Sequence, residues 1–330
     1  MKTYEVQLKD TRLFKPVLLD YLQNHEELRP FFGLPPTLES YGQLLEQRNF
    51  SGSSRQVLHK SLLEQYKNIK NIPQEQIDAL LADNTFTVTT GHQLNIFGGP
   101  LFFIYKLVTA INLARQLKAT YPEYHFVPVY WMASEDHDFD EINHFYLFGQ
   151  KWDWHHPEAG NAVGRLSTAG LPELMEQIGE VPEMFRQAYD GTRTLAEATR
   201  YFVNELFGHE GLVVLDADDA ALKGLFRPVM QQEISQQKAE KSVLAASASL
   251  DEMGYKTQVF PRPINLFYLN GQVRERLEQT KEGRYQVLNT SISFSETEIA
   301  SELEQYPGRF SPNVVMRPVY QETILPNLGY

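Results

Sequence analysis

The sequence contains no cysteine, so it forms neither disulfide bonds nor thiolate metal sites. Basic residues are scarce as well, because 30 lysines and arginines stand against 42 aspartates and glutamates, giving a formal net charge of −12. Nucleic acids and anionic membranes attract surfaces rich in lysine and arginine. We therefore expect neither as a partner, and the lack of cysteine fits a cytoplasmic protein.

Long apolar runs are also absent. The nearest to one, at about 101–114, is interrupted by Lys106 and Asn112 and is shorter than the roughly 18 residues that cross a bilayer. The N-terminal MKTYEVQLKD lacks the apolar centre of a signal peptide. With 42% hydrophobic and 22% charged residues, the 330-residue chain has the composition of a globular protein and the length of about two domains.

Changes in composition and residue pattern along the sequence predict that the chain has four parts. They are a polar helical lead-in packed on the core (1–84), an α/β core (85–253) with an irregular excursion at about 144–170, a small α+β insert (254–310), and a return to the core (311–330). Within the last part, 314–316 and 323–325 are the segments expected to reach the core.

A strand–helix–strand pattern defines the core. TFTVTT at 85–90 is β-branched and aromatic, 101–117 has apolar residues at helical spacing, and FVPVYWMA at 126–133 has the composition of a buried strand. Such a unit predicts a parallel sheet. GLVVLD at 211–216 predicts another strand, and Asp218 or Asp219 is expected to cap the helix after it.

The insert has local signals of its own. Asn270-Gly271 between apolar segments predicts a β-hairpin. Ser295 and Glu298 have the spacing of a capping box and predict the start of a helix.

Polar residues follow the first predicted strand, at the edge where ligands bind in open parallel sheets. Gly98 and Gly99 precede a predicted helix, whose N-terminus suits phosphate or carboxylate. The alternative is that these glycines only form a tight turn. Neither GxxxxGK[ST] nor GxGxxG occurs, so spacing alone identifies no nucleotide. The residues considered for a ligand here are Gly91, His92, Gln93, Gly98, Gly99 and Lys106.

The acidic run SEDHDFDEINH follows the second predicted strand. One interpretation is a carboxylate site for Mg²⁺ or a substrate ammonium group, and another is acid–base chemistry by His137 between acids. The third is a solvated helix start capped by Asp138 or Asp140. The spacing of His137 and His144 matches no familiar zinc signature, so no structural zinc is expected.

Three further side chains are candidates for anion binding. Arg165 in GNAVGRLS either binds an anion or lies free on the surface. Arg317 and Gln321 lie among apolar residues where the chain is expected to re-enter the sheet. An arginine in such a setting has an anionic partner, which is either a ligand or a structural carboxylate.

Five segments together resemble the cysteine-adding enzymes of bacillithiol synthesis, the BshC family. They are TGHQLNIFGGPLFFIYK, PVYWMASEDHDFDEINH, VGRLS, GLVVLDADD and SPNVVMRPVYQETILPNLGY, in that order along the chain. The resemblance implies a Rossmann-like parallel sheet similar to class I nucleotidyl transferases and synthetases, with a connective-peptide-like insert. It also implies a C-terminal coiled coil that forms a homodimer. Because no such coiled coil is found here, the chain is expected to be the N-terminal part of a longer protein.

The resemblance implies a ligase that joins the carboxylate of L-cysteine to the amino group of glucosaminyl-malate, with ATP and Mg²⁺. Activation yields either a cysteinyl adenylate or an acyl phosphate. Two alternatives are a non-enzymatic nucleotide- or metabolite-binding module and a nucleotidyl transferase with another acceptor. A third is a metal-dependent hydrolase built on the acidic run.

If the chain is part of such a ligase, we expect its residues to have the following roles. The catalytic residues are His137 as base, Asp138 and His92, and Asp136 and Asp138 hold Mg²⁺. The ATP-binding residues are Gly91, His92, Gln93, Gly98, Gly99 and Lys106. The substrate-binding residues are Glu135, Asp136, Arg165, Asp216, Arg317 and Gln321.

Overall fold

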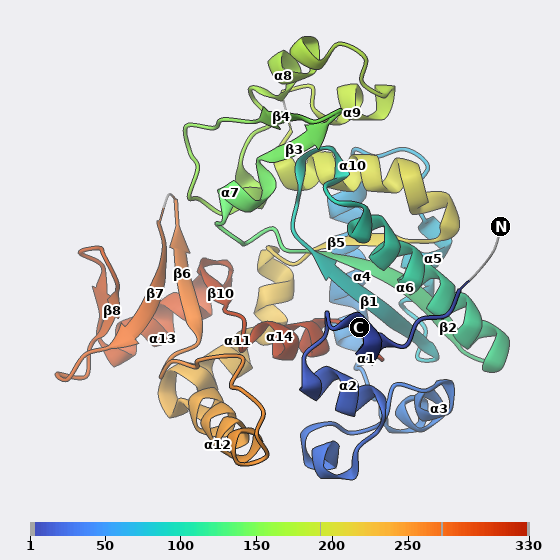
Figure 1. Cartoon of the computed structure of the whole chain (residues 1–330). Helices are drawn as coiled ribbons and strands as arrows, with labels where there is room; N and C mark the ends of the chain where they lie inside the picture. The colour runs from blue at the N-terminus through green and yellow to red at the C-terminus, as the bar shows by residue number, and fades with distance from the viewer. Residues whose placement is uncertain (1–3, 192, 272, 329–330) are drawn as a thin grey trace.

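The computed structural model describes residues 4–191, 193–271 and 273–328 (Figure 1). Within these ranges the central sheet has three parallel strands, in the order β1 (Thr85–His92), β2 (His125–Met132) and β5 (Val213–Asp216). The predicted parallel α/β core is therefore confirmed. None of the helices in these ranges has the length and apolar content needed to span a membrane.

The sheet forms because its strands are buried on both faces, as parallel strands require. Helix α6 (Leu101–Thr120) makes the crossover from β1 to β2 and covers one face, where Val88 packs against Ala110, Ala114 and Leu117. On the other side, α4 (Gly52–Tyr66) and α10 (Leu195–Phe207) contact β5. The buried hydroxyl of Tyr66 accepts a hydrogen bond of 2.7 Å from the backbone N–H of Val214.

Short helices precede the sheet. They are α1 (Leu8–Thr11), α2 (Pro16–Leu22), α3 (Leu38–Gln47), α4 and α5 (Gln74–Ala79). Only α4 and α5 contribute fully buried apolar side chains such as Leu58, Leu62 and Ile77 to the main core. Figure 1 shows α1, α2 and α3 in blue, at one end of the molecule.

The excursion expected to be irregular contains a β-hairpin, formed by β3 (His144–Leu147) and β4 (Gln150–Asp153). That expectation was wrong because the turn is made by Phe148 and Gly149, with φ angles of 51° and 80°. Two positive φ angles suit a two-residue hairpin, but phenylalanine is no turn signal. The helices of this region are α7 (Phe139–Ile142), α8 (Leu171–Ile178) and α9 (Glu183–Ala188).

After β5 the chain forms two long helices, α11 (Ala220–Gln236) and α12 (Lys238–Glu252). Asp219 caps α11, as predicted, by accepting hydrogen bonds from the backbone N–H groups of Ala221 and Leu222. The helices are separated by Gln237 in the left-handed conformation, with a φ angle of 51°.

The insert is an antiparallel sheet covered by α13 (Glu296–Gln305), drawn in orange and red in Figure 1. Its strands, in the order β10–β6–β7–β8–β9, are β10 (Phe310–Pro312), β6 (Leu266–Asn270), β7 (Val273–Gln279), β8 (Tyr285–Val287) and β9 (Ser293–Phe294). The hairpin predicted at Asn270-Gly271 joins β6 to β7. The capping box of Ser295 and Glu298 begins α13, as predicted.

The end of the chain meets the sheet later than expected. Residues 314–316 form a turn, and 323–325 contain the end of α14 (Arg317–Ile324). Pairing with the free edge of β1 is made by the next residues: Thr87 donates to the carbonyl of Pro326 and accepts from the N–H of Leu328, at 2.9 and 3.0 Å. Gly329 and Tyr330 lie outside the described residues.

We predict that Gly164→Ala destabilises the fold by about 1–3 kcal/mol, because overpacking a close contact forces the backbone to shift. A β-carbon there would overlap the side chain of Ser134 and lie 3.0 Å from its Cα. The matched control is Gly224→Ala in α11, where no atom lies within 4 Å of the new methyl group. Urea unfolding should show a lower midpoint for the first variant only, and equal midpoints would contradict this.

Candidate functional site

A cleft opens at the carboxyl ends of β1 and β2, with a volume of about 620 Å³. One wall is β1 and α6, and the other is α14 with the residues before it. We call this the main cleft. It brings together seven of the residues predicted from sequence, namely Gly91, His92, Gln93, Lys106, Asp136, Arg317 and Gln321.

His92 is half-buried in the main cleft. Its ring centroid lies 5.1 Å from that of Phe102 and 5.0 Å from that of Phe103. Its Nδ1 lies 3.0 Å from the carbonyl oxygen of Gln93. Burial lowers the pKa of His92, an effect that the Gln93 carbonyl partly offsets and the nearby charge of Lys106 strengthens. The ring is therefore held as neutral imidazole near pH 7.

Arg317 and Gln321 lie one helical turn apart on α14 and both line the cleft. Among the described residues, no carboxylate or other acceptor binds the guanidinium of Arg317. Gln321 is only 8% exposed. Its buried Nε2 has no hydrogen-bond partner among the residues that the structure describes. Buried donors are normally satisfied, so Gln321 Nε2, with the half-buried Arg317 beside it, is suited to an acceptor supplied by a ligand.

A neighbouring cavity of about 540 Å³ shares His92, Gln93 and Phe102 with the main cleft. It reaches Gly99 and Pro100 at the start of α6. Of the two glycines predicted to bind a ligand, Gly99 thus lines this neighbouring cavity but not the main cleft. Gly98 is buried and does not line either cavity.

The acidic run places Asp136, His137 and Asp138 side by side, with one ligand atom from each within 4.8 Å of the others. His137 Nδ1 lies 3.6 Å from Asp136 Oδ1, and its Nε2 lies 4.0 Å from Asp138 Oδ1. Asp138 precedes α7 but its side chain makes no capping hydrogen bond. Carboxylate oxygens are the ligands that Mg²⁺ prefers, so Asp136 and Asp138 fit that ion.

Arg274, which no motif in the sequence marks as a site residue, reaches this cluster from β7 of the insert. Its Nη1 lies 2.8 Å from His137 Nδ1, and its guanidinium carbon lies 4.0 Å from the centre of the Phe267 ring. Burial lowers the pKa of Arg274, while Asp136 and Glu135 favour its charged form. No sequence signal could have found this contact, because 137 positions separate the two residues.

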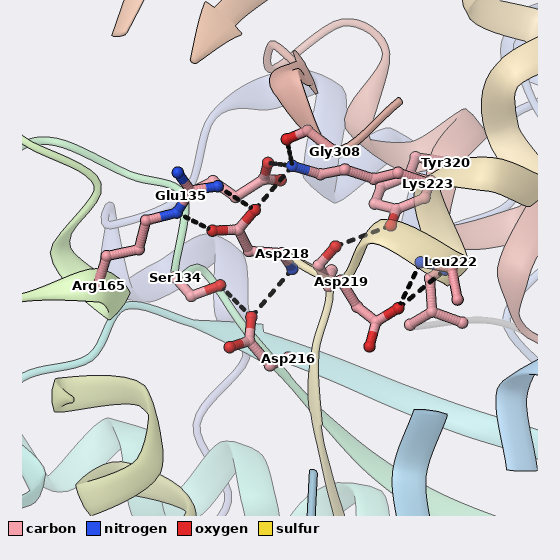
Figure 2. Close-up of polar contacts among 12 residues, drawn as sticks. Ser134, Glu135, Arg165, Asp216, Asp218, Asp219, Leu222, Lys223, Gly308 and Tyr320 are labelled. Carbon is pink, nitrogen blue, oxygen red and sulfur yellow. Dashed lines mark hydrogen bonds and ion pairs between the residues drawn. The ribbon is translucent and has the colours of Figure 1, made fainter. Parts of the chain in front are cut away.

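Glu135 does not line the main cleft but belongs to a buried ion-pair network around Lys223 (Figure 2). Lys223 Nζ lies 2.5 Å from Glu135 and 2.7 Å from Asp218, and it donates to the carbonyl of Gly308 at 3.2 Å. Burial opposes the charge of Lys223, but the two carboxylates outweigh it and raise its pKa. For Asp218, burial by itself would raise the pKa, but the positive charges of Lys223 and Arg165 lower it to about 2.

Arg165 and Asp216 lie in the same region as this network, apart from the main cleft. Arg165 forms a bidentate pair with Asp218, at 2.6 and 2.8 Å. Asp216 accepts from the hydroxyl of Ser134 at 2.5 Å and from the N–H of Asp218 at 3.0 Å. Both residues line a separate cavity of about 590 Å³ beside α4 and α10. The structure thus gives both of these candidates protein partners.

We predict that Lys223→Met lowers the free energy of unfolding by about 3–5 kcal/mol, because it removes the cation paired with the buried carboxylate of Glu135 and leaves Asp218 with Arg165 alone. The control is Arg227→Met, one turn along α11, whose pair with Glu304 is exposed and contributes about 0–1 kcal/mol. Denaturant unfolding of both variants measures the difference. Similar losses in the two would show that Lys223 is not the centre of the network.

The sheet order, the crossover helix and the polar cleft at the carboxyl edge define a Rossmann-like α/β domain. Over residues 1–330 the chain matches the family model described as "Bacillithiol biosynthesis BshC, N-terminal Rossmann-like domain". The chain belongs to this family, so the resemblance seen in the five sequence motifs is confirmed.

Curated relatives carry the name "Putative cysteine ligase BshC". The relative from Flavobacterium johnsoniae is 44% identical over 344 residues, which cover 100% of this chain and 64% of the relative. The relative from Cytophaga hutchinsonii is 43% identical, covering 99% of this chain and 62% of its own length. One from Natranaerobius thermophilus is 31% identical, with 95% and 62% covered. The chain thus spans less than two thirds of these relatives.

Proposed function

We propose that this chain is part of a cysteine ligase of bacillithiol biosynthesis, which joins the carboxylate of L-cysteine to the amino group of glucosaminyl-malate. Family membership and the name of the relatives support the reaction class. The structural observation that carries the proposal is the buried Nε2 of Gln321, which has no hydrogen-bond partner among the described residues, beside the guanidinium of Arg317 in a cleft at the carboxyl edge of the sheet.

The main cleft is complementary to a carboxylate-bearing substrate. Arg317 presents a planar set of N–H donors that matches a carboxylate. Gln321 Nε2 adds a neutral donor. The malate half of glucosaminyl-malate carries carboxylates, so we place that half beside α14.

A free carboxylate does not condense with an amine in water, so the cysteine carboxylate has to be activated, and ATP is the reagent we propose. Gly91, Gln93, Gly99 and Lys106 would hold it near the start of α6, where unpaired backbone N–H groups favour phosphate. Asp136 and Asp138 would hold Mg²⁺, which neutralises phosphate charge when it is bound.

The test is an assay of the complete protein with L-cysteine, glucosaminyl-malate, ATP and Mg²⁺, followed by mass spectrometry. Bacillithiol with AMP supports the adenylate route, and bacillithiol with ADP supports the acyl phosphate. Ligand binding by a folded protein without any product would favour the non-enzymatic binding module.

We predict that Arg317→Gln raises the KM for glucosaminyl-malate by about 10–100-fold, because a charge-assisted hydrogen bond contributes about 1.5–3 kcal/mol. The kcat should change less than KM if the lost contact serves binding alone. Arg276→Gln is the control, since Arg276 lies on β7 and its pair with Glu278 is outside the cleft. An unchanged KM in Arg317→Gln would remove Arg317 from the substrate site.

A further inference from the structure

The hydrogen bonds of the two histidines near the cleft determine where each ring carries its proton. His92 Nδ1 faces the carbonyl oxygen of Gln93 at 3.0 Å, and a carbonyl oxygen only accepts. Nδ1 of His92 therefore carries the proton and donates it to this bond. In the neutral ring Nε2 is then left with a free lone pair, which is a proton acceptor.

The bond to His137 has the opposite polarity. Its Nδ1 faces Nη1 of Arg274 at 2.8 Å, and a guanidinium only donates. Nδ1 of His137 is therefore the acceptor in this bond, and the proton of the neutral ring is on Nε2. His137 thus offers an N–H donor at the position where a general base needs a lone pair.

Arg274 is held in place independently of His137. It extends from β7, opposite Leu269 in the hairpin register, and its guanidinium stacks on the ring of Phe267 at 4.0 Å. The side chain is half-buried, which limits the solvent competing for the bond to His137. The insert therefore supplies a donor to a residue that follows a strand of the core.

We propose that His92, rather than His137, accepts the proton during ligation, and that Arg274 is a positioning residue that keeps His137 as an Nε2–H donor. This inference rests on the proposed ligase function and reverses the roles expected from sequence. The low pKa that burial imposes on His92 agrees with it, because a neutral imidazole is required.

The proposed step balances as follows. The amine nitrogen of glucosaminyl-malate attacks the carbonyl carbon of the ATP-activated cysteine, and the new C–N bond forms. The bond between that carbon and the phosphate oxygen breaks, and the leaving phosphate group takes the electron pair. One proton of the amine passes to Nε2 of His92, while the N–H of His137 is available to a developing negative charge.

The first test needs no substrate. Long-range ¹H–¹⁵N NMR of the histidine rings distinguishes the two tautomers, and the signals of the nine histidines are assigned by substitution of His92 and His137. We expect Nδ1–H for His92 and Nε2–H for His137. Arg274→Gln should shift His137 toward a mixture of tautomers and leave His92 unchanged, whereas the control Arg276→Gln should change neither.

The second test exploits glutamine, whose side chain can replace an Nε2–H donor but cannot take up a proton. In the ligation assay, the kcat of His137→Gln should be at least tenfold higher than that of His137→Ala. His92→Gln should recover none of the roughly 100-fold or greater loss in His92→Ala. The inference would be overturned if glutamine restored kcat at position 92 and not at position 137. A proton on Nε2 of His92 in the spectra would overturn it as well. Expected tautomers without bacillithiol formation would count against the ligase function only.

Discussion

Lys223 carries its charge at a position with no exposed side-chain surface, and the arrangement of the site depends on how that charge is neutralised. Its partners are Glu135 after β2, Asp218 after β5 and the carbonyl of Gly308 shortly before β10. A buried charge is tolerated only when every partner is in place. The ion therefore ties the parallel sheet to the insert, and the position of the insert relative to the main cleft depends on this contact.

Two neighbouring residues in the loop after β2 have different partners. Glu135 turns inward to Lys223, whereas Asp136 turns to the main cleft. A structural carboxylate and one available to ligands thus alternate along the chain. The acidic run therefore serves two purposes in the fold, although its residues are chemically alike in the sequence.

Local features could be predicted because neighbouring residues encode them. The capping box of Ser295 and the hairpin at Asn270-Gly271 are of this kind. The Phe148-Gly149 turn escaped prediction because phenylalanine rarely adopts a positive φ. The partners of Lys223 and Arg274 escaped it because folding alone brings such distant positions together.

The pairing of residues 326–328 with β1 has a consequence for how the protein is made. Contacts between segments so far apart in sequence form slowly, since a long loop has to close first. During synthesis β1 leaves the ribosome long before residues 326–328, which pair with its edge. Its edge then exposes unpaired backbone groups that can pair with another nascent chain. The edge of β1 is therefore most open to such pairing during translation, before the last residues described here have emerged.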